Sequence, residues 1–211
     1  INELLGRLGI DSHFVRGKRV TTKETVQVVE MVLSGLVNKR IVSAINAAGA
    51  PAVGLCGADG RILECRIAAP ELGFVGDPVT VHPAAIRALH GAGIMPVIGP
   101  IGFIPGKDAD QLVNVNADTV AGNIAAALDA ERLVFLTDVE GVRGADGHTI
   151  PRLTAGEARG LIASGTVSGG MIPKVEACLH ALSLGVPVQI VDGRQPGMLL
   201  ALEGNGTVFE P

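Results

Sequence analysis

The sequence predicts an α/β fold in which a mainly parallel sheet lies between two layers of helices. Apolar residues make up 47% of the 211 residues and aromatic residues only 2%, so the core must be built from Val, Leu, Ile and Ala. Short aliphatic runs alternate with segments of helical spacing, which is typical of parallel sheets covered on both faces. Polar loops follow several of these runs, at the edge where ligands bind in open α/β folds.

In the first half of the chain, the sequence predicts a helix at residues 2–9 and a polar, basic turn or short ribbon at 12–20. Thr21 or Thr22 should cap a long helix, and Asn38 should begin a separate helix that ends at Gly49. The other predicted elements are strands at 52–55, 61–68 and 94–98, a glycine-rich connection at 71–77, a helix at 82–90 and a charged hairpin-like tip at 105–111.

In the second half, Thr154 and Glu157 have the spacing of a capping box that opens a short helix. Aliphatic runs predict strands at 133–137 and 186–191, and residues 207–209 could form an edge strand. The remaining predictions are helices at 117–128, at 172–184 and just before the last strand, and a polar loop at 138–150.

Charge and composition exclude several classes of function. The net charge is −4 and no basic patch stands out, so we expect no binding to nucleic acid or to an anionic membrane. No apolar run approaches the roughly 18 residues of a membrane span, and no signal peptide is found. Neither the histidines nor the three scattered cysteines (Cys56, Cys65, Cys178) have metal-ligand spacing, so we expect reduced thiols, no metal site and a cytoplasmic location.

The run from Asn114 to Thr119 holds two amides, a carboxylate and a hydroxyl where a loop turns into a helix. Asn, Asp and Thr all cap helices well, so this run could simply begin a well-capped helix. The same helix start could also face an anionic substrate, because its free N–H groups and dipole favour negative charge. The run by itself leaves both interpretations open.

The run from Ser168 to Lys174 is the second polar motif. Paired glycines let the backbone approach a phosphate closely, and Lys174 is a mobile cation of the kind that phosphoryl transfer requires. A flexible helix entry with a solvated lysine would have the same sequence. The chain has neither the P-loop pattern nor a Rossmann G-x-G-x-x-G, so a nucleotide would have to be bound in another way.

Two further runs could bind ligands. Residues 137–142 follow an aliphatic strand, where a hydroxyl, a carboxylate and backbone groups could hold a nucleotide. Residues 16–21 carry three cations, and an arginine there could grip a carboxylate. An ordinary strand exit and a solvated basic turn are the alternatives. Asp192 and Arg194 are most simply explained as a turn with a local ion pair.

Six short motifs occur in one order: R-G-K-R-V-T, L-V-N-K-R, E-L-G-F-V-G, N-V-N-A-D-T, L-T-D-V-E-G-V and G-G-M-I-P-K-V. From about Leu4 to Arg194 this order and spacing resemble the N-acetylglutamate kinases of the amino acid kinase superfamily. The resemblance implies one amino acid kinase domain over 1–211, a three-layer αβα sandwich. Residues 1–115 would form the acetylglutamate-binding and dimerisation lobe, and 116–211 the ATP-binding lobe.

The resemblance also implies a reaction. The γ-phosphoryl of ATP, accompanied by Mg²⁺, would pass to the side-chain carboxylate of N-acetyl-L-glutamate. The products would be N-acetylglutamyl 5-phosphate and ADP, in the second step of arginine biosynthesis. A carboxylate is a poor nucleophile, so catalysis would come from positioning and cationic stabilisation.

Site residues follow from the motif positions that match. Arg19 would grip the substrate's α-carboxylate, and Asn114 and Asn116 would contact the substrate. Asp118 would orient the catalytic lysines, and Lys174 would neutralise charge on the phosphoryl group in transfer. The positions that match the ATP-side loops are Thr137, Asp138, Gly141, Gly170 and Met171.

The chain departs from the family pattern at both ends. The family's K-x-G-G and H-G-G-G strands, which supply another catalytic lysine and phosphate-binding N–H groups, are not found in the 211 residues. We expect a strand–helix–strand unit of ~30 residues or more to precede Ile1, and the 211 residues alone to be nearly inactive. The segment from Leu200 to Thr207 is shorter than in arginine-inhibited members, so we expect no strong feedback inhibition by arginine.

Two other functions fit parts of the sequence. The Gly35–Arg40 segment and the short ending also resemble kinases that act on carrier-protein-bound aminoadipate in lysine biosynthesis. A non-catalytic binding subunit is the other alternative, since the second lysine and the glycine loops are absent from the chain. The resemblance suggests at least a homodimer, with an interface predicted at a helix around residues 68–92.

Overall fold

The computed structural model describes residues 1–15 and 18–210, and the chain divides into two compact units, Ile1–Val120 and Ala121–Pro211. The sequence predicted the boundary between lobes near residue 115. The helix α5 (Ala117–Ala127), which follows the N-V-N-A-D motif, runs across the observed division. Each unit is therefore described by itself.

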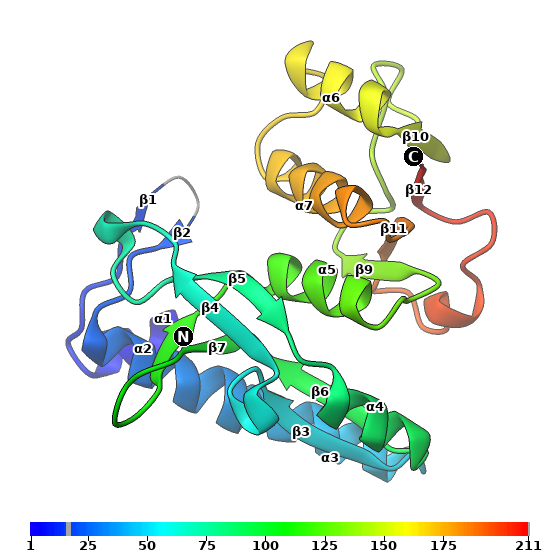
Figure 1. The fold of residues 1–211 in the computed structure, drawn as a ribbon. Helices are drawn as coiled ribbons and strands as arrows, with labels where there is room; N and C mark the ends of the chain where they lie inside the picture. Colours follow the sequence, from blue (N-terminus) through cyan, green and yellow to red (C-terminus); the bar gives the residue numbers. More distant parts are fainter. Residues whose placement is uncertain (16–17, 211) are drawn as a thin grey trace. The chain divides into compact units, whose positions relative to one another are not determined.

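One long helical stretch dominates the first unit (Figure 1). After the short helix α1 (Asn2–Arg7) and a β-ribbon, it runs through α2 (Lys23–Glu30), a π-helical segment (Met31–Val37) and α3 (Asn38–Ala47). Thr22 caps it, because its hydroxyl oxygen accepts from the backbone N–H of Thr25 at 3.2 Å. The predicted break at Asn38 is wrong: Val37 and Asn38 both have right-handed helical dihedrals, so the helix continues.

The buried side chain of Asn38 explains why no break is needed. Its Nδ2 donates to the carbonyls of Leu55 at 3.1 Å and Val97 at 2.8 Å, so the amide binds two strands instead of capping a helix. Lys39 Nζ donates to Asn38 Oδ1 at 3.2 Å. Gly54 makes this packing possible, because a Cβ there would collide with Asn38 Oδ1.

Among its described residues, the first unit also contains three sheets. A ribbon pairs β1 (Phe14–Val15) with β2 (Lys18–Arg19), and β3 (Ala52–Cys56) pairs in parallel with β6 (Met95–Gly99). The third sheet has the order β5-β4-β7-β8, with bounds Gly76–Val81, Leu63–Ile67, Ile101–Ile104 and Gln111–Asn114.

The third sheet confirms one prediction for this unit and corrects another. The antiparallel pair β7–β8 flanks the predicted hairpin tip at 105–111. The prediction of a helix around 68–92 is wrong. That stretch consists of a 3-10 turn (Pro70–Leu72), the unforeseen strand β5, which completes the sheet by pairing with β4, and the helix α4 (Ala84–Gly91), which confirms the helix predicted at 82–90.

The second unit is built around one mixed sheet with the order β10-β12-β11-β9. Its strands are β9 (Leu133–Thr137), β10 (Arg152–Thr154), β11 (Val188–Asp192) and β12 (Thr207–Glu210), with helices α6 (Ala155–Ala163) and α7 (Met171–Ser183). The predicted capping box at Thr154 and Glu157 is confirmed. The last strand is not an edge strand as predicted: β12 lies between β10 and β11, and the expected last helix is only a 3-10 turn (Met198–Leu200).

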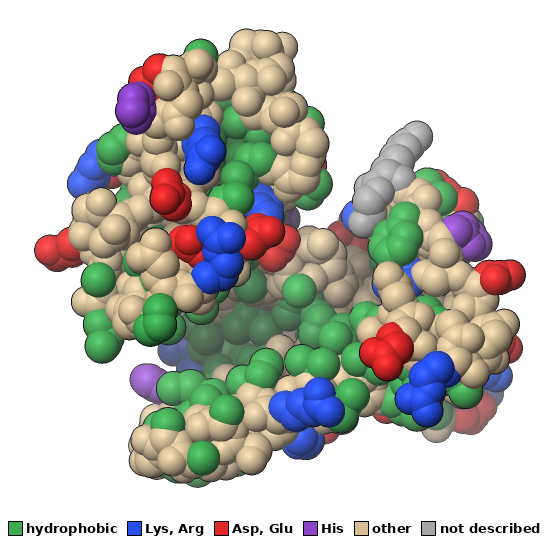
Figure 2. Space-filling model, turned by 180° about the vertical axis from the view of Figure 1, so that it is seen from behind, with side chains coloured by type: hydrophobic (Ala, Val, Ile, Leu, Met, Phe, Trp, Pro, Cys, Tyr) green, Lys and Arg blue, Asp and Glu red, His purple; other side chains and the backbone are tan. Residues whose placement is uncertain are grey.

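The face in Figure 2 carries mixed charge, and the cysteines are free thiols, as the sequence predicts. No helix among the described residues is long and apolar enough to cross a membrane. Figure 2 shows basic and acidic side chains interspersed over the face in view. All three cysteines are free and buried, and burial, together with the charges of Asp77 and Glu64, raises the pKa of Cys65 to about 12.

Replacing Asn38 should test the importance of its buried amide. We expect Asn38→Ala to lower the free energy of unfolding by about 2 to 3 kcal/mol, because two partly buried carbonyls lose their donor and the buried side chain leaves a gap. Ser43→Ala on the exposed face of the same helix is the matched control and should change it by less than about 0.5 kcal/mol. Urea denaturation of the three proteins measures this, and equal midpoints would contradict the assignment.

Candidate active site

The first unit contains a pocket of about 150 Å³ that gathers the predicted substrate residues. Arg19, Asn114 and Asn116 all line it, although about a hundred residues of sequence separate the arginine from the asparagines. Its other lining residues are Lys18, Val75, Gly76, Asp77, Val115 and Thr119. The pocket therefore combines two cations and two amides with the carboxylate of Asp77, which pairs with Arg66 at 2.7 Å. The unpaired charge of the lining is positive, which suits an acidic, hydrogen-bonding ligand.

Main-chain bridges bring the walls of this pocket together. Residue 21 pairs in parallel with Gly73, and Val75 pairs in parallel with Asn114. The backbone N–H of Phe74 donates to the Thr21 carbonyl at 2.8 Å, and that of Asn114 donates to the Phe74 carbonyl at 2.9 Å. The segment 73–75 thus holds the arginine-bearing ribbon and the end of β8 on its two sides.

Arg19 is partly buried and held by neighbours on three sides. Its Nη2 donates to Asn2 Oδ1 at 2.7 Å, and its Nη1 contacts the hydroxyl of Ser12. The guanidinium lies over the ring of Phe14, 4.6 Å from the centroid. Burial lowers the pKa of Arg19, but an arginine remains charged at neutral pH. Arg16 and Gly17 of the same motif lie outside the described residues.

Asn116 both begins helix α5 and lines the pocket. Its Oδ1 accepts from the backbone N–H of Thr119 at 2.9 Å and from the Thr119 hydroxyl at 3.2 Å. The capping interpretation of this motif is therefore confirmed for Asn116. Because these bonds use the carbonyl end of the amide, Nδ2 is the group that Asn116 can offer to a ligand. A donor at that position suits an anion.

The second unit has its own pocket, of about 300 Å³, next to the polar loop that follows β9. Gly141 and Met171, two of the predicted ATP-side residues, line it. The other lining residues are Val139, Arg143, Thr166, Val167 and Ser168. One wall therefore comes from the loop after a strand and the other from the segment that enters α7.

Thr137 and Asp138 do not line this pocket, although the loop that they begin does. The backbone N–H of Val139 donates to Thr137 Oγ1 at 3.3 Å, and the carbonyl of Thr137 accepts from Gly193 N–H at 2.8 Å. Thr137 therefore shapes the loop from within. Asp138 is exposed. The hydrogen bond and charge of Asp192 chiefly raise the pKa of Arg194, and the negative charge of Asp138 adds to this.

Lys174 projects from the first turn of α7 and is half-buried. It follows Met171 by three positions, so both side chains lie on the same face of the helix, and Met171 faces the pocket. Gly170 is the last residue before this helix. Asp118 is half-buried in the first turn of α5, within the first unit. Lys174 and Asp118 thus belong to different units.

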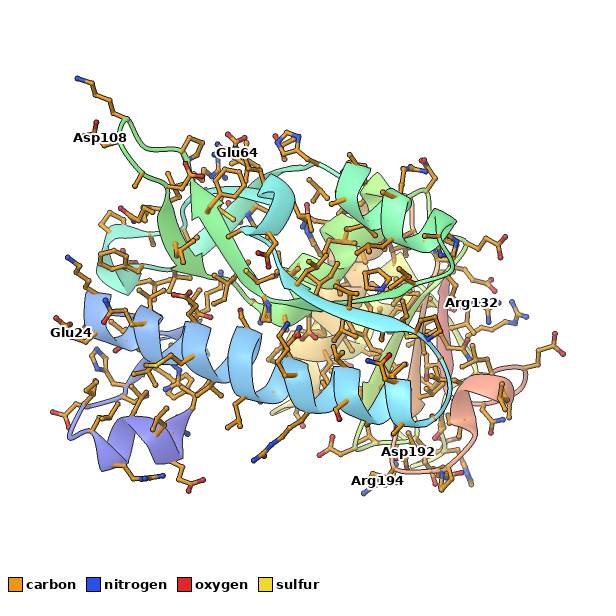
Figure 3. The ribbon with its side chains drawn as sticks, turned by 90° about the horizontal axis from the view of Figure 1, so that it is seen from below. Glu24, Glu64, Asp108, Arg132, Asp192 and Arg194 are labelled. Carbon is orange, nitrogen blue, oxygen red and sulfur yellow. The ribbon has the colours of Figure 1, made fainter. Side chains whose placement is uncertain are left out.

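Asp192 and Arg194 form the ion pair expected at the end of β11, and Figure 3 shows the two labelled side chains together. Arg194 Nε donates to Asp192 Oδ1 at 2.9 Å and its Nη2 donates to Oδ2 at 2.8 Å. These bonds lower the pKa of Asp192 to about 2, so its carboxylate stays ionised at neutral pH. Asp192 also lines a further hollow, together with Glu140 and Asn205.

Sequence reasoning missed several lining residues of both pockets. It did not assign Lys18 and Asp77 to the first pocket, or Arg143, Thr166 and Val167 to the second. Thr166 and Val167 stand directly before the motif that begins at Ser168, so their position in the chain was a usable signal. Asp77 gave none, because only the unforeseen strand β5 brings it to the pocket.

Comparison with known proteins assigns the chain to one family. The model of the amino acid kinase family matches residues 1–192. An acetylglutamate kinase from Cereibacter sphaeroides is 54% identical over 99% of this chain and 72% of its own length. One from Paracoccus denitrificans is 56% identical over 95% of this chain and 66% of its own length. The chain belongs to the amino acid kinase family and, within it, to the acetylglutamate kinases.

Solved structures agree with this assignment. A Streptococcus mutans protein, smu.665, matches with a TM-score of 0.84 at 25% identity, covering 99% of this chain and 80% of its own. An N-acetylglutamate synthase from Neisseria gonorrhoeae, complexed with coenzyme A and N-acetyl-glutamate, matches with a TM-score of 0.82 at 26% identity. It covers 100% of this chain and 49% of its own. The predicted family and α/β fold class are confirmed.

Proposed function

We propose that the first unit binds N-acetyl-L-glutamate and the second binds ATP, for transfer of the γ-phosphoryl to the side-chain carboxylate of N-acetyl-L-glutamate. The products are N-acetylglutamyl 5-phosphate and ADP, in arginine biosynthesis. The observation that supports this most directly is the pocket of the first unit, which unites Arg19, Asn114 and Asn116. In the proposal the reaction takes place in the cytoplasm.

The acceptor pocket matches the charge of this substrate. N-acetyl-L-glutamate has two carboxylates and one amide, and the pocket offers Lys18, Arg19 and the free Nδ2 of Asn116. Arg19 grips the α-carboxylate, since a guanidinium binds a carboxylate through two parallel hydrogen bonds. Asn114 and Asn116 contact the remaining polar atoms of the substrate.

The second pocket takes the nucleotide between the loop after β9 and the start of α7. Gly141 and Met171 line it, Thr137 and Asp138 shape the loop, and the α7 N-terminus behind Gly170 offers N–H groups to phosphate oxygens. Lys174 neutralises the charge that develops on the transferring phosphoryl group. Asp118, in the first turn of α5, is the other proposed catalytic residue.

Mg²⁺ accompanies the ATP phosphates in this proposal. The described residues contain no group of three or more His, Cys, Asp or Glu side chains that could hold a metal ion. This fits an ion that the phosphates and water hold in large part, as is usual for Mg²⁺ at nucleotide sites. The ion supplies charge neutralisation of the phosphates when bound.

A second copy of the chain is the proposed partner. Exposed apolar side chains gather on the long helix of the first unit, at Met31, Leu36, Val37 and Ile41, which are 54%, 50%, 39% and 45% exposed. The region 68–92, where sequence analysis placed the interface, has fewer, of which Val79 on β5 is 57% exposed. The long helix is therefore the better-supported homodimer interface.

Removing the guanidinium of Arg19 should weaken acceptor binding. We expect Arg19→Ala to raise the Kd for N-acetyl-L-glutamate about 10- to 100-fold, because a charge-assisted pair with the α-carboxylate is lost. Titration calorimetry measures this, with MgATP affinity as the internal control. Arg7→Ala, an exposed arginine on α1, removes the same charge and should leave both affinities unchanged. An equal loss in both variants would contradict the proposed contact.

Removing Lys174 should affect ATP more than ADP. We expect Lys174→Ala to weaken MgATP binding about tenfold and MgADP binding less than about twofold. In the proposal the lysine contacts the γ-phosphoryl group, which ADP lacks, and neither of the other two phosphates. The matched control is Arg159→Ala, which removes an exposed cation from α6 of the same unit. Both affinities can be measured by calorimetry on the 211-residue chain. A parallel fall in ATP and ADP affinity would refute the assigned position.

A charge on the long helix should disrupt the homodimer. We expect Ile41→Asp to convert the dimer to monomer in light scattering, because an aspartate cannot be buried unpaired in an apolar interface. Val79→Asp tests the alternative interface at 68–92 and should leave the dimer intact. Dissociation by Val79→Asp alone would move the interface to β5.

A further inference from the structure

Thr21 is a polar residue that is fully buried between the ribbon and the helix α2. Its backbone N–H donates to the Leu72 carbonyl at 3.0 Å, and its carbonyl accepts from Phe74 N–H at 2.8 Å. Gly73, the residue paired with it, has φ +68°, and a Cβ there would collide with the Thr21 carbonyl oxygen. These main-chain contacts fix the position of Thr21 independently of its side chain.

The hydroxyl of Thr21 connects two residues of the acceptor pocket. Its Oγ1 donates to the Arg19 carbonyl at 3.0 Å and accepts from Asn114 Nδ2 at 3.3 Å. A hydroxyl has one proton and two lone pairs, so donation to Arg19 leaves it only an acceptor toward Asn114. The amide of Asn114 must therefore turn its NH₂ group to Thr21 and its Oδ1 away from it.

Thr21 itself is not among the described residues that line the pocket, whereas Arg19 and Asn114 both are. Any effect of Thr21 on the acceptor must act through these two. With its amide orientation fixed, Asn114 meets the ligand with a defined arrangement of donor and acceptor, which reduces the ordering that binding would otherwise require.

We propose that Thr21 is a positioning residue for the acceptor, whose hydroxyl fixes the amide of Asn114 and the main chain at Arg19. The proposal rests on the proposed function, because the acceptor is taken to be N-acetyl-L-glutamate. It assigns Thr21 an effect on acceptor affinity and none on the nucleotide, whose proposed pocket belongs to the other unit.

The neighbouring threonine provides a matched control. Thr22 is exposed and caps α2 through its own hydroxyl, which accepts from Thr25 N–H. Removing it weakens the helix cap without touching Asn114 or the Arg19 carbonyl. A loss of stability can therefore be separated from a loss of positioning.

The experiment measures N-acetyl-L-glutamate and MgATP binding by calorimetry, with thermal unfolding in parallel, for the wild type, Thr21→Val, Thr21→Ser and Thr22→Ala. We expect Thr21→Val to weaken acceptor binding about tenfold and to leave MgATP binding within about twofold. Thr21→Ser keeps the hydroxyl and should restore acceptor affinity to within about twofold of the wild type. Thr22→Ala should lower the unfolding temperature with acceptor affinity unchanged.

A double-mutant cycle with Asn114→Ala tests whether Thr21 acts through Asn114. If it does, Thr21→Val costs less than about twofold in acceptor affinity once Asn114 is alanine. Full additivity, or unchanged acceptor affinity in Thr21→Val while the wild type binds, overturns the inference and leaves the proposed function standing. A wild type that binds MgATP but not N-acetyl-L-glutamate overturns both. Should Thr21→Val fail to fold, Thr21→Ala enters the same cycle.

Discussion

Main-chain hydrogen bonds on the two sides of residues 72–75 are the constraint on which the acceptor pocket depends. One side of this segment binds residue 21 and the other binds Asn114, so two parts of the chain that are far apart in sequence meet at a fixed separation. Main-chain bonds suit this purpose, because they are insensitive to side-chain rotamers. The cation of the ribbon and the amides before α5 can then face a ligand from rigid supports.

The second unit arranges its pocket by a different means. Its sheet places the carboxyl end of β9 beside that of β11, and the loop after β9 turns back through the hydroxyl of Thr137. The opposing wall is the entry to α7, where glycines replace bulky side chains. In the second unit, strand ends and a helix start therefore form the walls of the pocket. In the first unit, paired main-chain segments hold the walls together.

Local patterns in the sequence predicted much of the fold. The capping box at Thr154, the strand at 133–137 and the helices α5 and α7 were identified because their signals lie within a few neighbouring residues. Strand β5 and the interior position of β12 could not be predicted, because pairing with distant strands determines them. The residues of the candidate sites divide in the same way between local and long-range signals. Arg19, Asn114 and Gly141 lie in recognisable motifs, whereas Asp77 and Thr21 become relevant only through tertiary contacts.

The π-helical segment at Met31–Val37 changes how the long helix must be compared with other helices. A π-turn inserts one extra residue into the i to i+4 pattern, and such segments are rare. The faces of α2 and α3 are therefore offset by about one residue, a rotation of about 100°, relative to a continuous α-helix. A helical wheel drawn through both halves would assign Asn38 to the wrong face. In a chimaera with a regular helix, residues 31–37 would have to be exchanged as one block.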